Sequence, residues 1–114
     1  MRYPHYLTKK IRENAVLLEA QHGQSVDGEE IVKAEHARYV NAIMTICGMY
    51  DGSGEFALTV GFPAKSGVGG GILGVIPRTM GIGVYAPALD KHGNSMAGVK
   101  VLAQLSRELD LSIY

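Results

Sequence analysis

The sequence predicts an α+β domain with a short antiparallel sheet and flanking helices. Helical periodicity in the apolar residues occurs near both ends of the chain, and three short strand-like runs follow one another between them. Thirteen of the 15 glycines lie between Gly48 and Gly98, in that middle part. Strands in direct succession, rather than strands that alternate with helices, are typical of antiparallel sheets. The expected order is therefore helix, helix, three strands, helix.

Two helices are expected in the first half of the chain. Apolar residues recur on one face of residues 8–22, and Gly23 follows as a stop signal. A second helix is expected over residues 34–47 and ends at Gly48. Residues 29–32 suit either a short strand or a helix start. One face of this second helix should pack on the core and comprises Ala37, Val40, Ile43 or Met44, and Cys47. Cys47 is expected to be a small core residue rather than a reactive thiol.

Three strands are expected next. Residues 55–60 carry Phe56, Leu58 and Val60 at a period of two, which favours a strand. Residues 72–76 and 82–86 are two further apolar runs, joined by a hairpin-type loop at residues 77–81. A sheet of only about three strands leaves two edges open.

A last helix closes the predicted domain. Asn94 or Ser95 can cap its N-terminus, and the helical pattern continues to about Leu109. The stripe that should face the sheet comprises Gly98, Leu102, Leu105 and Leu109.

Composition excludes several classes of function. The 114 residues suffice for one domain, so separate cofactor and substrate domains are excluded. Eleven basic residues balance 11 acidic ones, which argues against a nucleic-acid surface. No run approaches 18 apolar residues, so no membrane partner is expected. The single Cys forms no internal disulfide, so a reducing, cytoplasmic setting is expected.

The glycine-rich window at residues 61–74 shares features with two nucleotide-binding motifs. In a P-loop the glycines precede the Lys-Ser pair, but here they follow Lys65, so that motif is absent. Residues 69–74 match G-x-G-x-x-G as a string. A dinucleotide site requires this string to open a helix, whereas here it leads into the strand-like run 72–76. Neither nucleotide motif is therefore expected to bind a ligand.

The remaining feature of the window is the triplet Lys65-Ser66-Gly67. Penicillin-recognising serine hydrolases carry such a Lys-Ser/Thr-Gly triplet on an edge strand. Lysine supplies positive charge, the hydroxyl donates and accepts hydrogen bonds, and glycine lets a ligand approach the backbone. A solvated lysine in a glycine-rich connection is the alternative interpretation.

Longer strings around the triplet closely resemble the serine-dependent glutaminase family. The resemblance covers residues 23–114, while residues 1–22 match poorly and form a lead-in and helix. The strings are CGMYDGSGEFA at 47–57, PAKSGVGGG at 63–71 and LDKHGNS at 89–95, with weaker matches at 28–30 and 37–40.

This resemblance implies hydrolysis of L-glutamine to L-glutamate and ammonia, without a metal or organic cofactor. It also implies that the chain forms the C-terminal part of a β-lactamase/DD-peptidase-like fold. Tyr50 resembles the family's tyrosine beside the nucleophile, which contacts substrate and relays a proton. Val68 resembles the residue whose backbone N–H binds substrate and completes the oxyanion hole. Lys65 and Ser66 resemble the Lys-Ser pair that shapes the pocket floor.

The chain departs from the family pattern in one respect. The family's nucleophile lies in a Ser-x-x-Lys motif, and none of the six serines here has Lys three positions later. The resemblance therefore implies a chain that corresponds to the C-terminal portion of a glutaminase, carries half of the site and is inactive alone. A homo-oligomer or a complementing upstream segment is expected as partner. A non-catalytic interaction module of the same fold, or a penicillin-binding hydrolase, are the alternatives.

Overall fold

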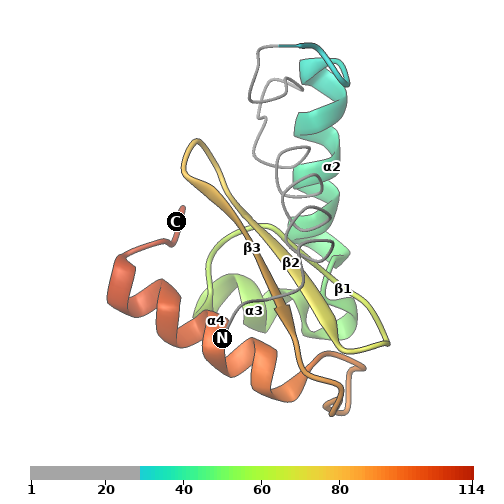
Figure 1. Cartoon of the computed structure of the whole chain (residues 1–114), viewed down its shortest axis with the longest axis vertical. Coiled ribbons are helices and arrows are strands. Elements are labelled where there is room, and N and C mark those ends of the chain that lie inside the picture. The colour runs from blue at the N-terminus through green and yellow to red at the C-terminus, as the bar shows by residue number, and fades with distance from the viewer. Residues whose placement is uncertain (1–28) are drawn as a thin grey trace, which may run out of the picture.

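The computed structural model describes residues 29–114 and confirms the α+β class (Figure 1). The helix expected over residues 8–22 lies outside the described residues. Within the described part, no helix is long and apolar enough to cross a membrane. The elements in chain order are α2 (Ala34–Cys47), a 3-10 turn (Tyr50–Gly52), α3 (Ser53–Thr59), β1 (Ala64–Ser66), β2 (Gly71–Ile76), β3 (Met80–Tyr85) and α4 (Met96–Leu109).

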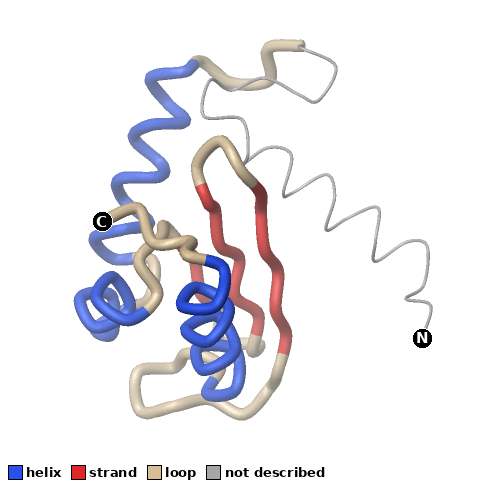
Figure 2. Tube along the Cα trace, turned by 90° about the vertical axis from the view of Figure 1, so that its left-hand side faces the viewer, coloured by secondary structure: helices blue, strands red, loops and turns tan. Residues whose placement is uncertain are grey.

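The three strands form one antiparallel sheet in the order β1-β2-β3. In the register, Lys65 lies opposite Leu73, and Leu73 lies opposite Gly83. Helices α3 and α4 cover one side of this sheet (Figure 2). The expected strands over 72–76 and 82–86 are therefore confirmed as β2 and β3 within one or two residues at their ends.

The strand expected over residues 55–60 is wrong, because this segment is helix α3. Phe56 and Val60 are both buried, whereas Leu58 is 90% exposed. A spacing of four residues therefore places the two buried side chains on one helical face, and the apparent period of two was coincidental. The third strand is instead β1, whose three residues are too few to show a periodicity.

The core lies between the sheet and helices α3 and α4. Phe56 of α3 packs edge-on against Phe62, with ring centroids 6.1 Å apart. Phe62 in turn occupies the space beside Gly74, where an added Cβ would lie 2.6 Å from the ring. The remaining buried core residues are Met49, Val60, Ala64, Ile72, Ile76, Leu102 and Leu111.

Helix α2 has the predicted bounds but not the predicted buried face. Of its expected core residues, Ala37 and Met44 are buried, while Val40 and Ile43 are about half exposed. The prediction that Cys47 is a core residue is wrong, since Cys47 is exposed and its thiol donates to the Ile43 carbonyl. Residues 29–32 belong to neither a helix nor a named strand.

Gly48 ends helix α2, as predicted, for a reason specific to the tertiary structure. An added Cβ would lie 1.9 Å from the carbonyl oxygen of Ala64. The Gly48 carbonyl accepts a hydrogen bond of 2.9 Å from the Ser66 amide. Only glycine therefore lets β1 approach the end of α2 this closely.

Helix α4 begins at the predicted cap. The Ser95 hydroxyl accepts a hydrogen bond of 3.1 Å from the Gly98 amide and donates one of 2.7 Å to the Ala86 carbonyl. The buried stripe comprises Gly98, Leu102 and Ser106. Leu109, which was expected in this stripe, is 56% exposed, because the stripe follows a spacing of four residues.

Candidate active site

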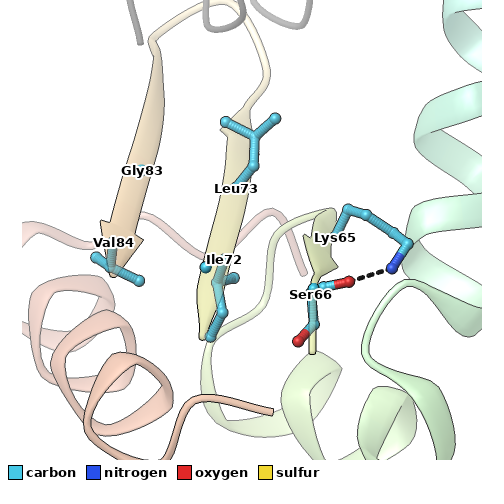
Figure 3. A pocket seen from close by; sticks show the side chains of 8 residues that line it. Lys65, Ser66, Ile72, Leu73, Gly83 and Val84 are labelled. Atoms are coloured by element: carbon cyan, nitrogen blue, oxygen red, sulfur yellow. Dashed lines mark hydrogen bonds between the residues drawn. The ribbon is translucent and has the colours of Figure 1, made fainter. Parts of the chain in front are cut away.

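Lys65 and Ser66 lie next to each other on the edge strand β1 but face opposite ways. Lys65 is exposed, while Ser66 is 1% exposed. The Lys65 ammonium donates a hydrogen bond to the carbonyl oxygen of Ser66 (Figure 3). The ammonium group is thereby held at the end of the strand, beside the end of helix α2.

Tyr50 reaches the same carbonyl from the turn after helix α2. Its hydroxyl donates a hydrogen bond of 3.3 Å to the Ser66 carbonyl oxygen, and the Lys65 Nζ lies 4.8 Å from the centroid of its ring. Tyr50 is 38% exposed. The structure thus brings together a phenol, an ammonium group and the Lys-Ser strand, three of the four features expected at the site.

The backbone of Tyr50 has a left-handed conformation, with φ of 53°. Left-handed backbone is unfavourable for a bulky residue and persists only where neighbouring contacts impose it. The Ser53 hydroxyl supplies two such contacts, donating to the Tyr50 carbonyl at 2.7 Å and accepting from the Met49 amide at 3.0 Å. This turn aims the phenol at β1.

The loop before helix α4 holds the same turn from the other side. The Asn94 amide group donates a hydrogen bond of 2.9 Å to the Met49 carbonyl. Asp90 orders this loop, because its carboxylate accepts from the amides of His92 and Asn94. Gly93 lies against the Tyr50 ring, with a built Cβ 3.8 Å from Cε2. The sequence predicted Asn94 only as a possible cap of the last helix, whereas in the structure its side chain holds the turn before Tyr50.

Val68 lies at the tip of the β1–β2 hairpin and is 71% exposed. The hairpin closes through hydrogen bonds from the Gly67 amide to Gly71 and from the Gly70 amide to Gly67. Among the described residues, none accepts a hydrogen bond from the Val68 amide. The backbone N–H is therefore available to a ligand that approaches the hairpin.

A shallow pocket of about 480 Å³ adjoins β1 (Figure 3). Its lining includes Lys65, Ser66 and Leu73, but neither Tyr50 nor Val68. The Ser66 hydroxyl is buried and has no hydrogen-bond partner. Buried hydroxyl groups without a partner are uncommon, because desolvation costs free energy that no contact offsets. Within residues 29–114, no contact therefore offsets the burial of the Ser66 hydroxyl.

Across residues 29–114, no group of three His, Cys, Asp or Glu side chains is arranged to hold a metal ion. The histidines of this part lie apart, with His36 exposed on α2 and His92 in the loop before α4.

Comparison with protein families decides the relationship. The sequence model of the glutaminase family matches residues 7–114. The chain belongs to the glutaminase family. Among its relatives, the glutaminase of Clostridium tetani is 64% identical over 87 residues, which cover 76% of this chain and 28% of that protein. The Clostridioides difficile glutaminase is 57% identical over 96 residues, covering 83% of this chain and 31% of that protein.

Solved glutaminase structures share the fold. A covalent complex between a Bacillus subtilis glutaminase and 5-oxo-L-norleucine, formed by reaction with 6-diazo-5-oxo-L-norleucine, superposes with a TM-score of 0.86 at 37% identity. The superposition covers 94% of this chain and 39% of that one. A Bacillus glutaminase crystallised in 4.3 M NaCl gives the same score and identity, over 93% and 37% of the two chains. The glutaminase chain described here thus spans less than two fifths of these relatives.

Proposed function

We propose that this chain supplies one wall of a glutaminase active site, which hydrolyses L-glutamine to L-glutamate and ammonia. The observation that carries the proposal is the meeting of Tyr50 and Lys65 at the Ser66 carbonyl. The covalent ligand of the Bacillus subtilis glutaminase supports it chemically. A ketone at carbon 5 of norleucine occupies the position of the side-chain amide carbonyl in glutamine.

The reaction needs a serine nucleophile. In the family this serine lies in a Ser-x-x-Lys motif, which the present sequence lacks. In the proposed reaction, a serine Oγ from a segment with Ser-x-x-Lys attacks the amide carbon. The carbon–nitrogen bond then breaks and the nitrogen leaves as ammonia after it has gained a proton. Water hydrolyses the resulting glutamyl ester to give glutamate and free serine. No metal or organic cofactor enters this sequence of steps.

The roles proposed for this chain are those that the resemblance to glutaminases implies, and the contacts of Tyr50 with Lys65 and Ser66 support them. The Tyr50 hydroxyl transfers the proton between the serine and the leaving nitrogen, and Lys65 provides positive charge beside its ring. The Val68 amide donates to the oxyanion of the tetrahedral intermediate. Ser66 shapes the floor of the pocket beside Lys65.

The partner proposed for this chain is a polypeptide with the remaining part of a glutaminase. An exposed apolar face on α2 supports this proposal, made up of Tyr39, Val40, Ile43 and Ile46. Ile46 is 76% exposed and lies one turn before Tyr50, so a chain that covers this face reaches the site. We also propose assembly into a homo-oligomer. A cytoplasmic location is proposed as well, because a chain with a single cysteine does not depend on an internal disulfide.

Complementation tests the proposed function. Ammonia release from L-glutamine is measured for the purified chain, for a separately expressed segment of the Clostridium tetani glutaminase that contains Ser-x-x-Lys, and for their mixture. We expect activity only in the mixture, and none when the Ser of that motif is replaced by Ala. A mixture that forms a stable complex without releasing ammonia would refute the catalytic role and favour a non-catalytic interaction module.

A further inference from the structure

Ser53 lies where the turn that carries Tyr50 meets helix α3, of which it is the first residue. Ser53 is 5% exposed, so its hydroxyl has to find hydrogen-bond partners within the protein. The proposed glutaminase reaction assigns no step to this serine. Its contacts nevertheless reach Tyr50, to which that reaction assigns the proton transfer.

The Ser53 hydroxyl stabilises the turn rather than the helix. A serine at the start of a helix typically accepts a hydrogen bond from an amide group of the first helical turn. In α3 the N-cap position is Gly52, and no side-chain hydrogen bond is made there. The hydrogen bonds of the Ser53 hydroxyl lead back instead, to Met49 and Tyr50. Ser53 therefore holds the residues before α3.

The Ser53 hydroxyl bridges backbone groups on both sides of the N–Cα bond of Tyr50. Its Oγ accepts from the Met49 amide at 3.0 Å and donates to the Tyr50 carbonyl at 2.7 Å. The backbone amide of Ser53 donates to the same carbonyl. Rotation about the N–Cα bond of Tyr50 would move the Met49 amide and the Tyr50 carbonyl relative to each other. A single oxygen atom that binds both groups therefore opposes this rotation.

The direction of the Tyr50 side chain depends on the same rotation. Tyr50 has φ of 53°, a conformation that a bulky residue adopts only under constraint. At this φ the phenol lies beside Gly93, and its hydroxyl reaches the Ser66 carbonyl at 3.3 Å. A negative φ, which tyrosine prefers, would point the Cα–Cβ bond in another direction. The phenol would then lose its contact with β1.

We propose that Ser53 is a positioning residue for the glutaminase reaction. Its hydroxyl holds the Tyr50 phenol at the Ser66 carbonyl and acts only through that phenol. This inference rests on the proposed function, because the proton transfer is assigned to Tyr50 there. The role requires an atom that both donates and accepts a hydrogen bond, as the hydroxyl of serine or threonine does. Alanine offers neither, so the constraint on Tyr50 is lost with it.

A double-mutant cycle in the complemented mixture tests this role. The kcat and KM of ammonia release are measured for S53A, Y50F and the double variant, at a temperature where each is folded. We expect S53A to lower kcat at least tenfold and to change KM less than threefold. In the Y50F background S53A should change kcat less than twofold, because no hydroxyl remains to be positioned. An equal loss of kcat in both backgrounds would overturn the proposal.

Two further variants separate positioning from stability. S53T keeps a hydroxyl group on the same carbon atom and should retain at least a third of the kcat of the unaltered chain. Ser106, on α4, is also 5% exposed, and its hydroxyl donates to the Val60 carbonyl. S106A should therefore lower stability in urea, as S53A does, but leave kcat unchanged. A folded S53T variant as slow as S53A would contradict the proposal, as would an equal loss of kcat in S106A.

The isolated chain separates this inference from the proposed function. A nuclear Overhauser effect between the Tyr50 ring protons and the Gly93 α protons reports on the turn, because these groups lie side by side. S53A should weaken this effect at least threefold, whereas S106A should leave it unchanged. An inactive mixture with the unaltered chain would refute the proposed function. An unchanged Tyr50–Gly93 effect in S53A would instead overturn the role of Ser53.

Discussion

The Tyr50 hydroxyl donates a hydrogen bond of 3.3 Å to the carbonyl oxygen of Ser66, 16 positions later in the chain. The same carbonyl accepts a hydrogen bond from Lys65. One backbone oxygen on an edge strand thus holds both a phenol and an ammonium group. Because these two groups share an anchor, their relative position depends on the backbone of β1 and on the turn at Tyr50.

Tyr50→Phe should separate the chemistry at this site from the stability of the fold. The substitution removes one partly exposed hydrogen bond, so the free energy of unfolding should fall by only about 0.5–1.5 kcal/mol. Ammonia release in the complemented mixture should fall by about 100-fold or more, since the proton relay is lost. Tyr39→Phe, on an exposed tyrosine of α2, is the matched control and should change neither quantity. Equal activity of the two variants would contradict the role of Tyr50.

Ser66→Ala should leave the fold as stable as before or raise the free energy of unfolding by up to about 1 kcal/mol, because the buried hydroxyl that it removes has no partner. Ser106 provides the matched control. Ser106 is also buried, but its hydroxyl donates a hydrogen bond to the Val60 carbonyl. Ser106→Ala should therefore cost about 1–3 kcal/mol in urea unfolding. If Ser66→Ala were the more destabilising of the two, Ser66 would be a structural residue.

Gly48→Ala should destabilise the chain by about 1–3 kcal/mol or more, since the added methyl group meets the Ala64 carbonyl at 1.9 Å. Gly54→Ala is the matched control. It lies in α3 with no atom within 4 Å of a built Cβ, so alanine should stabilise the helix by up to about 1 kcal/mol. Urea unfolding curves of both variants measure this difference. Opposite signs for the two substitutions are expected, and equal effects would mean that β1 does not approach α2 as described.

Asn94→Ala should loosen the turn that presents Tyr50. The substitution leaves the buried Met49 carbonyl without the donor 2.9 Å away, at a cost of about 1–3 kcal/mol. Complementation should also lose activity, because the phenol is no longer held in place. Activity retained at a temperature where the variant stays folded would show that the loop before α4 does not position Tyr50.

Ile46→Lys should leave the isolated chain as stable as before, since Ile46 is 76% exposed. It should weaken association with the complementing glutaminase segment at least tenfold, because a charge would be buried on the apolar face of α2. Val101→Lys, on an exposed position of α4, is the control for added charge. Sedimentation velocity of the mixtures measures the association, and an unchanged complex with Ile46→Lys would place the partner elsewhere.

The sequence by itself determined those elements whose signals are local. Helix α2, strands β2 and β3 and the Ser95 cap of α4 follow from apolar periodicity and from capping chemistry within a few residues. The motif strings also predicted the family, because they are long and keep their order. Local signals predicted a strand where the structure has α3. Phe56, Leu58 and Val60 alternate as in a strand, but Phe56 and Val60 are also four residues apart, as on one face of a helix.

Tertiary structure alone decided which of these residues meet. The contact of Tyr50 with Ser66 depends on a left-handed turn and on the close approach of β1 to Gly48, and the hydrogen bond from Asn94 to Met49 joins residues 45 positions apart. The face that α2 buries likewise depends on segments distant in sequence. Such contacts arise from the packing of whole elements, whereas periodicity and capping report only on neighbours along the chain.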